Sequence, residues 1–128
     1  MYNYKIGLLI FCNLKSQALY TSHQFEKIVK AENFGVIKEI EILNYRPELI
    51  TSILEAYKNT NLGMIILVAP DADHFFPFTE LEEVGQRNEK FLVTLTLDEN
   101  IEKNLIKMIA KVKLHPNRPY RGCDSSCH

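Results

Sequence analysis

The feature that most constrains this chain is an uninterrupted apolar run, Ile-Gly-Leu-Leu-Ile-Phe-Cys at residues 6–12, followed by the polar break Asn-Leu-Lys-Ser-Gln at 13–17. An aliphatic run of this length that ends abruptly is typical of a strand buried on both faces of a parallel sheet. Ligands of such sheets bind beyond the carboxyl ends of the strands. The run therefore predicts a fold class and also the edge where chemistry should be sought.

The segments after this run alternate between helical and strand patterns. Helices are expected at 16–33, 47–57, 79–88 and 98–113, and strands at 36–43, 64–69 and 90–97. This alternation predicts a three-layer α/β domain with about four mainly parallel strands, right-handed crossovers and helices on both faces. Charged residues favour an edge position for strand 36–43, whereas strand 64–69 is apolar throughout and favours a central one.

Local signals place the ends of several helices. Gly35 is expected to stop the first helix, and Pro47 is expected to open the second. Thr79 and Glu82 have the spacing of a capping box at the start of the third. The apolar stripes expected to be buried are Leu19, Phe25, Ile28 and Val29 in the first helix and Ile101, Leu105, Met108, Ile109 and Val112 in the last.

Length, charge and cysteine content narrow the class of protein. The 128 residues predict one domain at 1–114, with a flexible tail at 115–128. A net charge of −1 gives no overall basic field for nucleic acid. We expect no membrane association, because the apolar runs are short and the N-terminus lacks a leader pattern. Three cysteines make no even disulfide framework, which favours a reducing, cytoplasmic location.

Three common ligand motifs are missing from the sequence. No Gly-x-Gly-x-x-Gly follows the first strand, and neither Gly-x-x-x-x-Gly-Lys-Ser/Thr nor Gly-x-Ser-x-Gly occurs. A dinucleotide site, a P-loop and a hydrolase elbow are therefore not expected. We expect no cofactor and no metal.

Several short segments together resemble a known family. The first strand ends in Phe-Cys-Asn-Leu-Lys-Ser at 11–16, Gln24 lies in the first helix, and Arg-Pro-Glu-Leu at 46–49 opens the second. In this order they resemble the N-terminal catalytic domain of the serine recombinases (resolvases and invertases), across residues 4–112. That family has a Tyr-x-Arg-x-Ser strand end, a Gln in its first helix and Asp-Arg-x-x-Arg after its third strand. The resemblance implies a resolvase-like fold.

The residues at the family's catalytic positions differ from its pattern. An ungapped match places Asn13 at the arginine and Lys15 at the nucleophilic serine, with Phe11 at the tyrosine. A shift of one residue places Ser16 at the serine but Leu14 at the arginine. The family's reaction transfers a DNA phosphoryl group to serine, and guanidinium groups stabilise the charge that develops on the phosphate. Either alignment leaves the strand end without its arginine.

The segment after the third strand departs in the same way. Asp73 matches the family's aspartate, but His74 and Pro77 stand at its two arginines. The chain has four arginines in all, and none lies between Arg46 and Arg87. The resemblance therefore implies a catalytically inactive domain that binds a protein partner, possible partners including a recombinase, as a regulatory module in DNA recombination or a related DNA transaction. The oligomeric state stays open.

Polar residues follow the first and third strands and are candidates for a ligand or partner site. If the two strands are neighbours, these residues form a polar pocket for an anion or a nucleotide-like ligand. Strand-end loops are usually polar for backbone reasons alone, and we favour this simpler interpretation. The residues are Asn13, Lys15, Ser16, Asp71, Asp73 and His74.

A second function class is a small enzyme acting on nucleosides or nucleotides. Glu82-Glu83-Val84-Gly85 after an Asp-bearing loop is weakly similar to the nucleoside 2-deoxyribosyltransferases, which use a glutamate nucleophile for glycosyl transfer. Glu82 or Glu83 would act with Asp73. Whether these carboxylates face a pocket or water discriminates the two classes.

The tail carries two further features. Arg118, Tyr120 and Arg121 are candidates for weak contact with nucleic acid or an acidic partner. Cys123, Cys127 and His128 have ligand types that suit zinc, but their spacing is not that of a Cys-x-x-Cys knuckle, and a flexible tail is favoured.

Overall fold

The computed structural model describes residues 3–44, 46, 50–57, 59–75, 83, 85, 86 and 91–114. Strands and helices alternate along this part of the chain, as the sequence pattern predicts. The order is β1 (Tyr4–Phe11), α1 (Lys15–Ala31), β2 (Gly35–Leu43), α2 (Ile50–Ala56), β3 (Met64–Ala69), α3 (Ala72–Phe75), β4 (Phe91–Thr96) and α5 (Ile101–Leu114).

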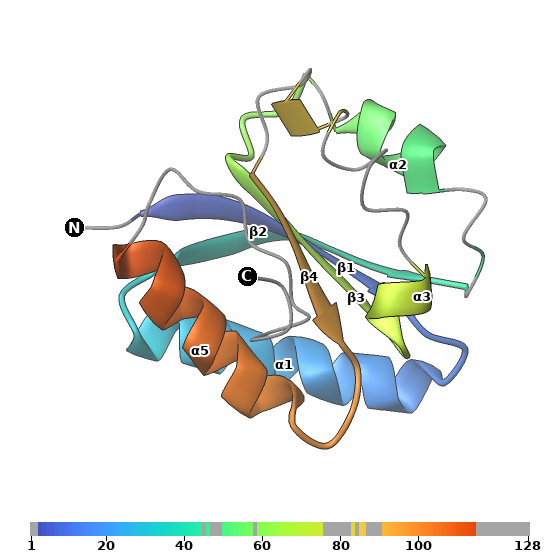
Figure 1. The fold of residues 1–128 in the computed structure, drawn as a ribbon, viewed down its shortest axis with the longest axis horizontal. Helices are drawn as coiled ribbons and strands as arrows, with labels where there is room; N and C mark the ends of the chain where they lie inside the picture. The colour runs from blue at the N-terminus through green and yellow to red at the C-terminus, as the bar shows by residue number, and fades with distance from the viewer. Residues whose placement is uncertain are drawn as a thin grey trace.

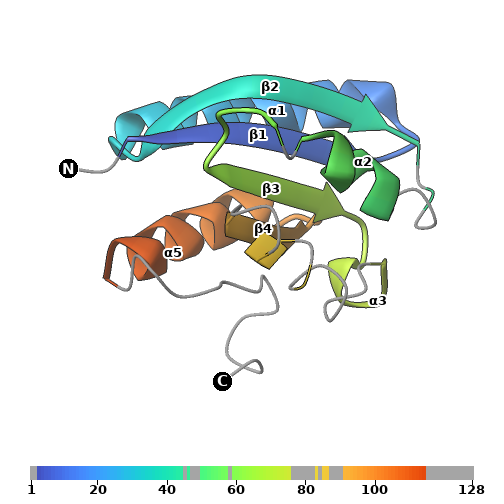
Figure 2. The same ribbon diagram turned by 90° about the horizontal axis from the view of Figure 1, so that it is seen from above.

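The strands form one parallel sheet in the order β2-β1-β3-β4 (Figures 1 and 2). The apolar strands β1 and β3 occupy its centre, and every residue of β3 is buried. The charged strand β2 lies at an edge, where its glutamates reach water. Both predicted strand positions are confirmed, because a strand with neighbours on both sides and helices on both faces has no solvent for charges.

Helices cover both faces of the sheet, so the predicted three-layer α/β architecture is confirmed. Helices α1 and α5 lie on one face and α2 on the other, while α3 follows the end of β3 (Figure 1). Alternate residues along β1 divide between two clusters of buried side chains. Ile6, Leu8 and Ile10 pack toward α1 and α5, whereas Leu9 and Phe11 pack with Tyr57 and Phe75 on the opposite face.

The predicted stripe of the last helix is confirmed, whereas that of the first is partly wrong. In α1 Leu19 is 43% exposed, and the small residues Thr21 and Ser22 are buried in its place. Phe25 and Val29 are buried as expected. The five stripe residues of α5 that the pattern predicts are all buried: Ile101, Leu105, Met108, Ile109 and Val112.

Gly35 does not stop α1, so that prediction is wrong. Asn33 takes the left-handed conformation after the helix, with φ at 52°, and Gly35 is the first residue of β2. A Cβ atom on Gly35 would overlap the carbonyl oxygen of Tyr4 on β1. The glycine is required because the two strands begin in close contact, not because a helix ends there.

An irregularity in β2 decides which of its side chains face α2. The register steps from Ile6 opposite Ile37 to Gly7 opposite Glu39, so one extra residue lies in β2. A bulge of this kind reverses the alternation of side chains beyond it. Glu39 and Glu41 are therefore placed on the same face as Leu9, which packs in the cluster with Tyr57.

Several predictions fall outside the described residues. They are the helix start at Pro47, the capping box of Thr79 and Glu82, and the tail 115–128 with Arg118, Tyr120, Arg121, Cys123, Cys127 and His128. Within the described residues, no helix has both the length and the apolar character needed to span a membrane.

Candidate functional site

The strand order places a reversal of chain direction between β1 and β3. From β1 the chain continues to β2 on one side, and from β3 it continues to β4 on the other. Ligands of open α/β sheets bind outside the carboxyl ends of strands at such a switch point. Residues Ile10 and Val68 are paired, so the segments after β1 and β3 emerge side by side. The condition set for the predicted polar pocket, that the first and third strands are neighbours, is therefore met.

The segment after β1 presents polar groups and the amino end of α1 to solvent. Asn13, Lys15 and Ser16 are all exposed. The N-cap residue Leu14 forms no side-chain cap, and the first turn contains no acidic residue. The free N–H groups of a helix start carry partial positive charge. Together with the Lys15 ammonium group, they make this part of the edge electropositive.

Cys12 fixes the turn between β1 and α1. Its side chain is buried. The backbone N–H of Leu14 donates to Sγ at 3.3 Å, and Sγ lies 3.5 Å from the Leu14 carbonyl oxygen and 3.8 Å from Oε1 of Gln17. A thiol is a weak donor and a weak acceptor. These contacts hold Leu14 in an extended conformation that leaves its side chain 64% exposed.

The segment after β3, where a polar strand-end loop is expected, forms the helical turn α3. Asp71 has a left-handed backbone, with φ at 53°, and its carbonyl oxygen accepts the N–H groups of His74 and Phe75. Thr96 at the end of β4 accepts the N–H of Ala72 through its hydroxyl at 3.2 Å. The rings of Phe75 and Phe11 lie 5.2 Å apart, which packs α3 against the end of β1.

This turn brings two predicted site residues into direct contact. Nδ1 of His74 lies 2.9 Å from Oδ1 of Asp71, and both side chains are largely exposed. Such a bond orients the imidazole ring. Asp73 also belongs to α3, but its side chain lies outside the description. The structure thus pairs Asp71 with His74 beyond the strand that neighbours β1.

The arrangement supports binding at a solvent-exposed surface. Exposed groups on two neighbouring segments can hydrogen-bond or attract a partner, but water and salt weaken each contact. Among the described residues, no group of three or more His, Cys, Asp or Glu is placed to hold a metal ion. Glu83 of the glycosyl-transfer hypothesis faces water, and Glu82 lies outside the described residues.

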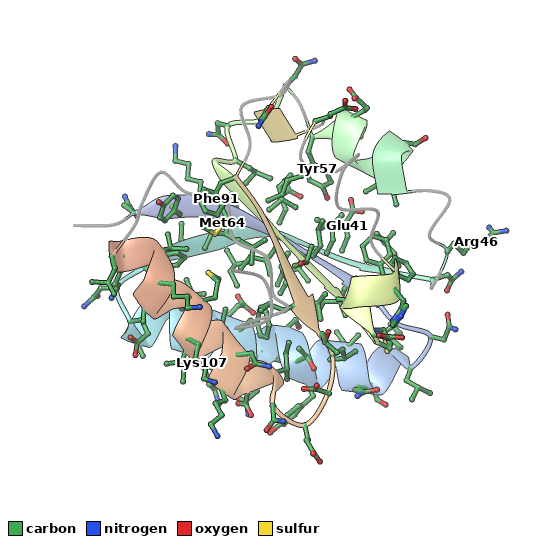
Figure 3. All side chains as sticks on the ribbon, in the orientation of Figure 1. Glu41, Arg46, Tyr57, Met64, Phe91 and Lys107 are labelled. Carbon is green, nitrogen blue, oxygen red and sulfur yellow. The ribbon has the colours of Figure 1, made fainter. Side chains whose placement is uncertain are left out.

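The positions that resemble the recombinase site are distributed between core and surface. Phe11, at the family's tyrosine, is buried in the core. Gln24 donates through Nε2 to the hydroxyl of Tyr20 at 2.8 Å on the exposed side of α1. Arg46 is exposed beyond the end of β2 (Figure 3).

Sequence reasoning missed two surface features. Leu14, Leu19 and Tyr20 are exposed at 64%, 43% and 61%, although burial is predicted for Leu19. We call the exposed group Leu14, Lys15, Ser16, Leu19 and Tyr20 the α1 surface. The second feature, Glu39 and Glu41 beside Tyr57, depends on the bulge in β2, for which the sequence carries no signal.

No family model matches the sequence, and no curated protein matches it. Two solved structures of S. aureus homoserine dehydrogenase, determined at pH 7.0 and pH 6.0, are similar in fold with TM-scores of 0.44 and 0.37. Both are 16% identical in sequence and cover 94% of this chain. This chain spans about a third of their length, 32% and 33%.

Proposed function

We propose that this chain is a serine-recombinase-like domain that binds another protein in DNA recombination or a related DNA transaction and does not cleave DNA. The cysteine usage supports a cytoplasmic location for this role. The observation that carries the binding role is the α1 surface. Exposed leucine and tyrosine surrounded by polar groups is the composition of a protein interface, in which large side chains supply most of the affinity.

The absence of cleavage chemistry is proposed from the residues that replace the family's catalytic ones. Asn13 or Leu14 stands at the first arginine, and His74 and Pro77 stand at the other two. Each removed transition-state donor costs on the order of 100-fold or more in rate. A serine at position 16, even if reactive, would lack the groups that bind and activate the phosphate.

Affinity capture from native extract tests the binding role, with and without nuclease. We expect a partner that survives nuclease with the wild-type chain and is lost with the double variant Leu19→Lys, Tyr20→Glu. Ile106→Lys is the matched control, because Ile106 lies on α5 and is 45% exposed. We expect this control to retain the partner.

Two outcomes would contradict the binding role, and a third would contradict the absence of cleavage. One is a partner lost on nuclease treatment, which would favour a nucleic-acid contact through residues such as Arg118, Tyr120 and Arg121. The other is no partner together with a gain in melting temperature on adding nucleosides or nucleotides, which would favour the enzyme hypothesis. Conversion of supercoiled plasmid by the wild-type chain, abolished by Ser16→Ala, would overturn the absence of cleavage.

A further inference from the structure

The face of β2 toward α2 carries two carboxylates beside a buried phenol. Glu39 and Glu41 are opposite Gly7 and Leu9 of β1, and both are exposed. Leu9 packs in the same cluster as Tyr57, the residue that follows α2 (Figure 3). We call Glu39, Glu41 and Tyr57 the β2 acidic edge. It is separate from the α1 surface, because α1 packs against the opposite face of the sheet.

The hydroxyl of Tyr57 is a buried polar group without a partner. Tyr57 is 6% exposed, and among the described residues its hydroxyl oxygen is the buried side-chain atom that has no hydrogen bond. Burial raises the pKa of the phenol, and the neighbouring Glu41 carboxylate and the charge of Glu39 raise it further, so the hydroxyl stays protonated. Glu41 is near enough to raise the pKa of the phenol, but no hydrogen bond to the hydroxyl meets ordinary distance and angle limits. An orphaned buried donor needs an explanation, and an unfilled binding site is one.

The backbone of β2 also has an outer side on which no described strand pairs. Among the described residues β2 pairs with β1 alone, and most residues of β2 are exposed. The free N–H and C=O groups of an edge strand can pair with an extended segment of another chain. The edge therefore offers main-chain hydrogen bonds next to two carboxylates.

We propose that the β2 acidic edge binds an extended basic segment of a partner protein, with arginine at alternate positions. The segment would add a strand beside β2, and its guanidinium groups would hold the carboxylates of Glu39 and Glu41. Arginine suits this role because its planar fork bonds both oxygens of a carboxylate. Once Glu41 is fixed in this way, the Tyr57 hydroxyl has an acceptor and the orphaned donor is satisfied.

Charge selects this occupant over a second copy of the chain. If two β2 strands paired antiparallel through their centres, the glutamates of one chain would lie against those of the other. Like charges directly across a strand pair are destabilising. A basic segment replaces this repulsion with attraction. Arginines at alternate positions lie on one face of the added strand, because successive side chains of a strand point to opposite faces.

An NMR titration of the ¹⁵N-labelled full chain tests this inference. The probe is a short synthetic peptide in which arginine and valine alternate, and its control carries glutamate in place of arginine. We expect the arginine peptide to shift amides of β2 and the glutamate peptide to leave them unchanged. Glu39→Gln with Glu41→Gln should weaken binding roughly tenfold, the sum of two exposed ion pairs of ordinary strength. The control pair Glu99→Gln and Glu102→Gln, exposed at the start of α5, should bind as wild type.

Two further probes distinguish the contributions of the Tyr57 hydroxyl and of main-chain hydrogen bonds to peptide binding from that of charge attraction. Tyr57→Phe should weaken the peptide about fivefold, the usual strength of one hydrogen bond, while the folded state is retained. N-methylation of alternate peptide amides on one edge should abolish binding, and methylation on the other edge should not. Equal loss in both glutamine pairs, equal binding of the glutamate peptide, or no shift in β2 at millimolar peptide would overturn the inference. None of these results touches the α1 surface, so the proposed function is tested separately.

Discussion

The two faces of the sheet are built in different ways. On one face the long helices α1 and α5 cover a continuous cluster that includes side chains from every strand. Its buried hydroxyl at Ser22 is satisfied, because Oγ donates to the Leu19 carbonyl oxygen at 2.8 Å. On the other face α2 has seven residues and α3 has four. There the buried hydroxyl of Tyr57 has no partner, and carboxylates stand beside it.

This difference indicates which face of the sheet stabilises the fold and which face carries polar groups that could bind a partner. Long helices that bury whole stripes supply the apolar area that holds a fold together. An orphaned donor beside charges costs stability, and such costs are found at functional sites. We infer that the packing of α1 and α5 on the sheet holds the fold while the solvent side of α1 carries the α1 surface, and that the α2 face is free to carry further binding groups. Three substitutions test this division.

The largest effect is expected for Leu105→Ala on α5. Leu105 is fully buried, and a leucine-to-alanine change in a core leaves a cavity that costs about 3 kcal/mol of unfolding free energy. Chemical denaturation measures the loss, and Ile106→Ala is the control because Ile106 is the next residue along α5 and its side chain is 45% exposed. The control should stay within about 0.5 kcal/mol of wild type. A loss below about 1 kcal/mol for Leu105→Ala would show that this face does not hold the fold.

The same contrast explains which parts of the fold could be predicted from the sequence. The stripe of α5 contains only large apolar residues at helical spacing, so its buried face follows from the period alone. The stripe of α1 includes Thr21 and Ser22, and the adjacent Leu19 points to solvent. A prediction from residue type therefore assigns the wrong buried face to α1, because packing against β2 and α5 decides which side chains are buried.

The candidate site divides in a similar way. Asn13, Lys15 and Ser16 lie at the same edge of the sheet as Asp71 and His74, because β1 and β3 are neighbours. The alternating pattern predicts a parallel sheet but leaves this strand order open. The contact between Asp71 and His74 does not follow from the pattern either, because it needs the left-handed backbone at Asp71 that opens α3. The β2 acidic edge depends on one extra residue in a strand. One extra residue in β2 turns every later side chain of the strand to the other face of the sheet. The composition of β2 does not predict where this extra residue lies.

Tyr57→Phe is expected to have the next largest effect and the opposite sign. Removal of an unpartnered buried hydroxyl should raise the unfolding free energy by about 1 kcal/mol at neutral pH. The folded-state pKa of Tyr57 is raised above the value of about 10 found in unfolded chains. Titration of Tyr57 therefore leaves the stability of the wild type unchanged below about pH 10, and lowers it as pH rises from there toward the folded-state pKa, because the unfolded chain loses its proton first.

The measurement is unfolding free energy against pH for the two proteins. The wild type should lose stability above about pH 10 more steeply than Tyr57→Phe, so the advantage of the variant should grow in alkali. Tyr20→Phe serves as the control, since Tyr20 is exposed on α1. If Tyr57→Phe lowers stability at neutral pH, the hydroxyl is satisfied in the free chain and the contrast between the faces fails.

Ser22→Ala on α1 is expected to have the smallest effect and gives the matched comparison. Like Tyr57→Phe, it deletes one buried hydroxyl, but here the hydroxyl is bonded to the Leu19 carbonyl oxygen. The lost bond costs about 1 kcal/mol, and the better helix propensity of alanine returns about half of it. We expect a net loss of about 0.5 kcal/mol, with no change in slope above pH 10. A gain equal to that of Tyr57→Phe would mean that burial of any hydroxyl is costly in this core. The orphaned state of Tyr57 would then no longer distinguish the two faces, and the case for the β2 acidic edge would rest on its carboxylates and free backbone alone.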